Sequence, residues 1–188
     1  MRTAIIAVVY AFLTIVCTLI DGSLSWAPIQ LRFSEALCVL AFFTSDAVPG
    51  LAIGCAIANL ANLGISGLGS FTAFGLVFGL LVTIAGSLFA WKYRGHIAIA
   101  ALGPLIANAL IIPAYLPLML ADASFYTIPF TGVAIGESYL LRYLFGVITI
   151  GVGEAIVMYA LGLPLARAVK DTEFARRLLR DDLAGNLT

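Results

Sequence analysis

The segment from Phe71 to Trp91, FTAFGLVFGLLVTIAGSLFAW, decides the fold class, because it holds 21 consecutive residues without a charged side chain. An α-helix needs about 20 apolar residues to cross the roughly 30 Å hydrocarbon layer of a membrane. The whole chain has this character, since 62% of its 188 residues are hydrophobic and only 11% are charged. A water-soluble domain of this size needs more polar residues to cover its surface. The sequence therefore predicts an integral membrane protein of the all-α class.

Five further apolar stretches accompany this segment, so we expect a polytopic protein with six transmembrane helices. The second stretch is shorter than a full span, and we expect it to be only partly embedded. The glycine-rich run from Gly64 to Ser70 predicts a flexible loop, because glycine is costly inside a helix. The predicted helices are residues 3–20, 31–43, 47–63, 71–91, 97–120 and 137–161.

The basic residues predict the orientation of the chain in a cell membrane. Arg32 and Arg142 fall on one side of the predicted helices, and the other eight fall at the termini and in the hairpin at residues 92–96. Basic residues favour the cytoplasmic side, so we expect both termini there. Those eight are Arg2, Lys92, Arg94, Arg167, Lys170, Arg176, Arg177 and Arg180.

We divide the chain into a transmembrane domain, residues 1–165, and a charged cytoplasmic tail, residues 166–188. The tail predicts a short amphipathic helix with Phe174, Leu178 and Leu179 on one side. We expect no cleaved signal peptide, because the first apolar stretch is too long for one and further membrane segments follow it.

Polar side chains within the predicted helices mark a candidate ligand site, because an ionised group inside a bilayer costs several kcal/mol. Arg32 and Glu35 share a helix face, where they either neutralise one another or hold a polar ligand. Glu154 has no basic neighbour in sequence and must point inward, toward another helix or water. Amide groups both donate and accept hydrogen bonds. The candidate polar residues are Gln30, Arg32, Glu35, Asn59, Asn62, Asn108, Glu137 and Glu154.

Aromatic residues at the predicted outer helix ends have two interpretations. Trp26, Phe33, Tyr126 and Tyr139 are typical of an aromatic belt at the membrane surface. They also suit a flat heterocyclic ligand, since stacking contributes about 1–3 kcal/mol per base. Trp26 and Phe33, which flank Gln30 and Arg32, are the favoured stacking pair, and Tyr139 is a further candidate.

Several missing motifs narrow the function. The sequence has no GxxxxGK[ST] phosphate loop, so we expect that the chain does not itself hydrolyse ATP. It also lacks HExxH, CxxC and GxSxG motifs and has one histidine, which disfavours an enzyme, a metal site or a cofactor. We expect no nucleic-acid partner and three free thiols at Cys17, Cys38 and Cys55. The alternative from a different functional class is an intramembrane enzyme or a structural assembly subunit.

Four stretches carry a family resemblance: AVVYAFLT at 7–14, IQLRFSEAL at 29–37, PGLAIGCAIANL at 49–60, and GEAIV at 153–157 with LGLPL at 161–165. Over nearly the whole chain they resemble the predicted queuosine-precursor transporters. The resemblance implies a six-helix substrate-binding S component of an energy-coupling-factor (ECF) transporter. Such a component captures a vitamin or related micronutrient outside the cell. Its implied partners are a transmembrane scaffold and two cytoplasmic ATPases.

The resemblance also assigns roles to particular residues. Ala7 and Ala11 match an alanine motif that packs against the scaffold, although small residues at this spacing also serve packing within a bundle. The implied ligand is a 7-deazaguanine, whose guanine edge would donate to Glu35 or Glu137 while Asn59 or Gln30 reads the carbonyl side.

A stand-alone secondary transporter is the runner-up, with Glu154 and Asn108 as its ion relay. The longer outer loop at residues 121–136 and the charged tail depart from the family pattern.

Overall fold

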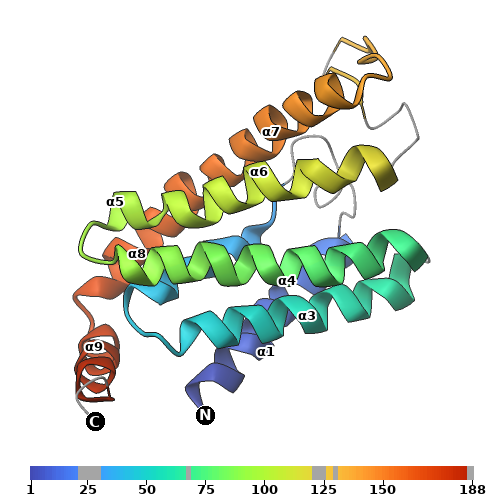
Figure 1. Cartoon of the computed structure of the whole chain (residues 1–188). Coiled ribbons are helices and arrows are strands. Elements are labelled where there is room, and N and C mark those ends of the chain that lie inside the picture. Colours follow the sequence, from blue (N-terminus) through green and yellow to red (C-terminus); the bar gives the residue numbers. More distant parts are fainter. Residues whose placement is uncertain (21–30, 67–68, 120–125, 129–130, 186–188) are drawn as a thin grey trace.

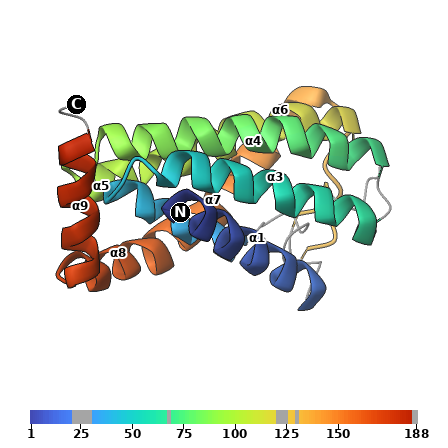
Figure 2. The same cartoon turned by 90° about the horizontal axis from the view of Figure 1, so that it is seen from below.

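The computed structural model describes residues 1–20, 31–66, 69–119, 126–128 and 131–185. Within these ranges the chain forms a bundle of helices, with a last helix lying across one end (Figures 1 and 2). An isolated antiparallel bridge joins Thr127 and Ala134. The all-helical class predicted from the apolar stretches is confirmed for the described residues.

The helices follow the predicted stretches. The first four are α1 (Arg2–Ile20), the 3₁₀-helix η1 (Phe33–Phe42), α3 (Ala47–Ser66) and α4 (Gly69–Lys92). A short α5 (Ile97–Ala100) and α6 (Leu102–Met119) come next. The last long rod joins α7 (Tyr139–Ala155), the π-helix η2 (Ile156–Gly162) and α8 (Leu163–Lys170), and α9 (Glu173–Gly185) ends the bundle.

Four segments of the described chain are long and apolar enough to cross a membrane: Arg2–Ile20, Phe74–Lys92, Ile97–Leu118 and Tyr139–Lys170. Two further apolar helices, Phe33–Phe42 and Ala47–Asn62, are shorter. Large apolar side chains face outward, with Val8 and Phe12 each 63% exposed. A lipid environment accounts for such a surface. Six complete spans therefore stay a prediction, while a helical membrane protein is supported.

Three boundaries differ from the sequence prediction. The loop predicted from Gly64 is wrong at its two ends, because α3 continues to Ser66 and α4 begins at Gly69. Helical glycine costs about 1 kcal/mol, which the long packing of α3 on α4 offsets. The predicted fifth helix breaks at Ala101, because Pro104 offers no N–H to the carbonyl of Ala100. The last span continues to Lys170, so the domain boundary drawn at 165/166 falls inside α8.

The tail helix packs on the bundle. Ala166, Ala175 and Leu178 are buried in the same apolar core as Phe42 and Phe43 at the end of η1. Figures 1 and 2 show α9 beside α8, at the end of the bundle where α4 turns into α5. The basic residues of these three segments therefore gather at one end, as the orientation argument requires. Which side of the membrane this end faces stays a prediction.

Candidate functional site

Glu35 is the centre of a buried polar cluster. It lies on η1 and is 1% exposed. The Tyr10 hydroxyl of α1 donates a hydrogen bond to its Oε1 at 2.5 Å. The Cys38 thiol donates to its Oε2 at 3.3 Å. The carboxylate is thus held from both sides, which fixes its direction inside the bundle.

The 3₁₀ geometry of η1 aligns the residues on either side of Glu35. With three residues per turn, side chains three apart eclipse one another, so Arg32, Glu35 and Cys38 form one row. Arg32 Nη1 lies 4.0 Å from Glu35 Oε1. That distance exceeds the roughly 2.7–3.2 Å of a direct hydrogen bond. The two charges are paired loosely, and the donors of the guanidinium are not saturated by this carboxylate.

Three other helices contribute groups that interact electrostatically with Arg32, namely Tyr10 of α1, Cys55 of α3 and Tyr115 of α6. The Tyr115 ring stacks on Phe78 of α4 with 5.0 Å between centroids and 20° between planes. Phe78 stacks in turn on Phe74, with centroids 6.0 Å apart. A row of stacked aromatic rings therefore extends from Phe74 and Phe78 of α4 to Tyr115, near the charged centre.

Glu154 brings a second carboxylate to this centre from α7. It is 4% exposed, which confirms the prediction that it points inward. It interacts electrostatically with Glu35 and Arg32. Its Oε1 makes no hydrogen bond with any described residue. The π-helix η2 begins two residues later, and such segments often occur at functional sites.

The three asparagines predicted as ligand residues have different surroundings in the bundle. Asn59 donates through Nδ2 to Cys55 Sγ and to the Gly75 carbonyl, both at 3.3 Å, and so links α3 to α4. Asn108 donates to the Pro104 carbonyl of its own helix at 3.0 Å. Asn62 is buried on α3. The Nδ2 groups of Asn59 and Asn108 therefore already donate hydrogen bonds within the bundle.

Three further predicted ligand residues, Glu137, Phe33 and Tyr139, are exposed rather than buried with Glu35. Glu137 is exposed before α7. Phe33 is 40% exposed, and Tyr139 is 47% exposed with its hydroxyl donating to the Ala114 carbonyl at 2.8 Å. Trp26 and Gln30 fall outside the residues that the structure describes.

Ala7 and Ala11 lie on the inner face of α1, where they are 2% and 5% exposed. A Cβ added at Gly54 of α3 would come within 2.7 Å of the Ala7 carbonyl oxygen. Only glycine permits this approach of α1 to α3. The alanine pair thus packs inside the bundle, and the outward side of α1 carries Val8 and Phe12 instead.

Sequence reasoning missed Tyr10, Cys38 and Tyr115 as members of the site. One signal was available for the first of them. Tyr10, Thr14 and Thr18 recur every four residues on a helix that is otherwise apolar from Ala4 onward, and all three are buried. Thr14 donates to the Ser34 hydroxyl at 2.8 Å, so Tyr10 and Thr14 of this row both contact η1.

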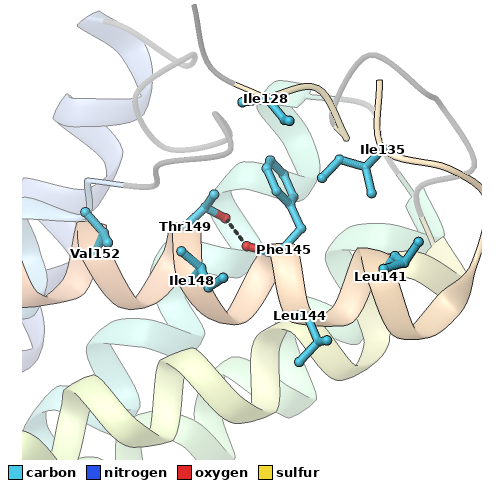
Figure 3. A pocket seen from close by; sticks show the side chains of 8 residues that line it. All are labelled: Ile128, Ile135, Leu141, Leu144, Phe145, Ile148, Thr149 and Val152. Carbon is cyan, nitrogen blue, oxygen red and sulfur yellow. Dashed lines mark hydrogen bonds between the residues drawn. The ribbon is translucent and has the colours of Figure 1, made fainter. Parts of the chain in front are cut away.

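An apolar cavity of about 480 Å³ lies elsewhere, on the outer side of α7 (Figure 3). Ile128 and Ile135 of the preceding loop lie over Phe145 and Thr149, and the Thr149 hydroxyl is already bonded to the Phe145 carbonyl. The remaining lining residues are Leu141, Leu144, Ile148 and Val152. A polar solute would find few hydrogen-bonding groups in this cavity.

Arg142 and Tyr126 fasten that loop to α7. The guanidinium lies 4.6 Å from the centre of the Tyr126 ring, and Arg142 Nε donates to the Gly136 carbonyl at 3.3 Å. Burial raises the pKa of Tyr126 to about 12, against a lowering by the Arg142 charge. Arg142 therefore serves loop structure, away from the Glu35 cluster. Among the described residues, no three His, Cys, Asp or Glu side chains gather as metal ligands.

Charged side chains at the centre of an apolar helix bundle define a class, namely membrane proteins that bind or move a polar solute. The comparison with protein families agrees. A model described as the QueT transporter matches residues 1–171, and the chain belongs to this family of queuosine-precursor transporters. The match includes every element of the cluster and ends before α9. No curated protein and no solved structure matches the chain.

Proposed function

We propose that this chain is the substrate-binding S component of an ECF-type transporter and captures a 7-deazaguanine queuosine precursor at the outer face of the cell membrane. Family membership supports transport of such a precursor. The observation that carries a binding role is the buried carboxylate of Glu35, oriented by Tyr10 and Cys38 and loosely paired with Arg32.

The chemistry of a guanine edge fits this centre. A carboxylate offers about four lone-pair sites, and Tyr10 and Cys38 use one on each oxygen of Glu35. The remaining sites accept the two adjacent N–H groups of the base as charge-assisted bonds. The Arg32 guanidinium donates to the neighbouring carbonyl oxygen, the role assigned from sequence to Asn59 or Gln30. Tyr115 and Phe78 supply an aromatic surface, with Trp26 and Phe33 as outer candidates.

The energy for uptake comes from other subunits in this proposal. The sequence contains no phosphate-binding loop, so a transmembrane scaffold and two ATPases would supply ATP hydrolysis. In this proposal, α1 is the helix that contacts the scaffold. The two termini and the end of the bundle formed by α8 and α9 lie in the cytoplasm. Because Ala7 and Ala11 are buried, this contact would use exposed residues of α1, which include Ile5, Val8 and Phe12.

A stand-alone secondary transporter is the second candidate, and Glu154 is the observation that favours it. A buried carboxylate with an unbonded oxygen is the kind of group that proton-coupled carriers use. Asn108, its predicted relay partner, is bonded within its own helix.

Reconstitution separates the two candidates. The purified chain in liposomes, given proton or sodium gradients in turn, is expected to bind the precursor without concentrating it. Addition of the scaffold, the ATPases and ATP is expected to start accumulation. Concentrative uptake driven by either gradient with the chain alone would overturn the partner-dependent proposal in favour of the secondary transporter.

A further inference from the structure

The buried centre of the bundle contains more carboxylates than cationic groups. Among the described residues, it contains one positive group, Arg32, and two carboxylates, Glu35 and Glu154. Arg142 is also buried, but it is committed to Tyr126 and the loop before α7. With both carboxylates ionised, the centre carries one net negative charge. An uncompensated charge is strongly disfavoured in a low-dielectric interior.

Glu154 is the carboxylate that lacks compensation. Glu35 already accepts bonds from Tyr10 and Cys38 and lies nearest the guanidinium, at 4.0 Å. Glu154 Oε1 accepts no bond from a described residue. The charged and titratable groups around it belong to η1, namely Arg32, Glu35 and Cys38. The one cation among them is therefore shared with Glu35.

We propose that Glu154 binds a positively charged substituent of the solute, so that the centre selects a solute with a single positive charge. This inference rests on the proposed function, because it places the 7-deazaguanine ring at Glu35 and Arg32. An ammonium group at Glu154 would form a charge-assisted hydrogen bond with the unbonded oxygen. It would also bring the net charge of the centre to zero. A neutral substituent leaves Glu154 uncompensated and binds more weakly.

Two probes of nearly equal shape test this selectivity by isothermal titration calorimetry on the purified chain in detergent. One is 7-aminomethyl-7-deazaguanine, which is a cation at neutral pH, and the other is the neutral 7-cyano compound. The wild-type chain is expected to bind the cation at least tenfold more tightly. Glu154→Gln keeps the shape but removes the charge, and is expected to abolish this preference. Glu173→Gln, an exposed carboxylate on α9, is the matched control and is expected to preserve it.

A second variant guards against a folding artefact. Glu154→Asp keeps the charge but withdraws it by one methylene, so it is expected to bind the cation more weakly and still to prefer it over the neutral probe. Thermal unfolding identifies any variant that fails to fold.

The outcomes separate this inference from the proposed function on which it rests. If both probes bind the wild type and folded Glu154→Gln retains a tenfold preference, the inference alone is overturned. Equal binding of the two probes by the wild type overturns it as well. If neither probe binds the wild type, the proposed function fails and the inference fails with it.

Discussion

At the scale of single residues, the orientation of Glu35 is set by contacts that connect distant parts of the sequence. Tyr10 is 25 positions away, yet its hydroxyl fixes one carboxylate oxygen, while Cys38 fixes the other from the next turn. A base that donates two parallel N–H groups requires such a preoriented acceptor. Preorientation lowers the entropy that binding must overcome.

Glu35→Gln is expected to weaken binding of a 7-deazaguanine by about 1.5–3 kcal/mol, the usual loss for a hydrogen bond to a charged group. Tyr10→Phe removes only the orienting hydroxyl and is expected to weaken binding by about 1 kcal/mol. Calorimetry on the detergent-solubilised chain measures both. Tyr93→Phe, an exposed tyrosine in the basic hairpin, serves as the matched control. Undiminished affinity in folded Glu35→Gln would leave Arg32 and Glu35 as a structural pair.

The sequence predicted part of this site for physical reasons. The cost of burying a charge was enough to place Glu35 and Glu154 inside. The three-residue spacing put Arg32 and Glu35 on one face whether η1 was an α-helix or a 3₁₀-helix. The bond from Tyr10 to Glu35 was not predictable, because the row of Tyr10, Thr14 and Thr18 indicates a polar helix face without identifying the residue that it meets. Asn108 was predicted as a ligand residue, but its amide donates to a carbonyl of its own helix. The spacing of residues in the sequence does not reveal such a local hydrogen bond.

At the scale of elements, the crossing of α1 and α3 depends on small residues. Ala7 approaches Gly54 so closely that a single added methyl group would collide with the Ala7 carbonyl. The sequence identified the small-residue pair Ala7 and Ala11, but not that Ala7 lies against Gly54 of α3. Periodicity identifies a packing face without identifying the helix that it packs against.

Replacing Ala7 and Ala11 by Trp is therefore expected to lower the thermal unfolding temperature and to abolish solute binding and uptake together. Overpacking a tight contact costs about 1–3 kcal/mol per site and occasionally more. Val8→Trp is the control for unfolding and solute binding alone, because Val8 lies on the exposed face of the same helix, where the scaffold contact is proposed. Unchanged unfolding and binding with uptake lost would instead place Ala7 and Ala11 at a scaffold interface.

At the scale of the whole molecule, the basic residues distinguish the two ends of the bundle. The turn from α4 to α5, α8 and α9 gather basic residues at one end, whereas Glu137 and the start of α7 lie at the other. Basic residues resist transfer across the membrane, so the first end is expected in the cytoplasm.

Cysteine labelling in intact cells tests this orientation. Gly95 and Gly136 lie toward opposite ends, and a Cβ added at either has no neighbour within 4 Å, so both accept cysteine without strain. A membrane-impermeant maleimide is expected to label Gly136→Cys in intact cells and Gly95→Cys only after permeabilisation. The unmodified chain measures background from Cys17, Cys38 and Cys55. The reverse pattern would invert the topology and move the solute site to a cytoplasmic entrance.

The π-helical segment η2 has a consequence for how the last rod is built. A π-turn holds more residues than an α-turn, and each residue of an α-helix advances about 100° around its axis. The seven residues from Ile156 to Gly162 therefore set the angle between the direction of Glu154 and the side on which Leu163 and Ala166 pack. Deleting one of them would rotate the direction of Glu154 relative to the tail by an angle on the order of the 100° that one α-helical residue covers. The length of this π-helical segment therefore determines how the Glu154 carboxylate is oriented relative to the surface on which the C-terminal helix packs.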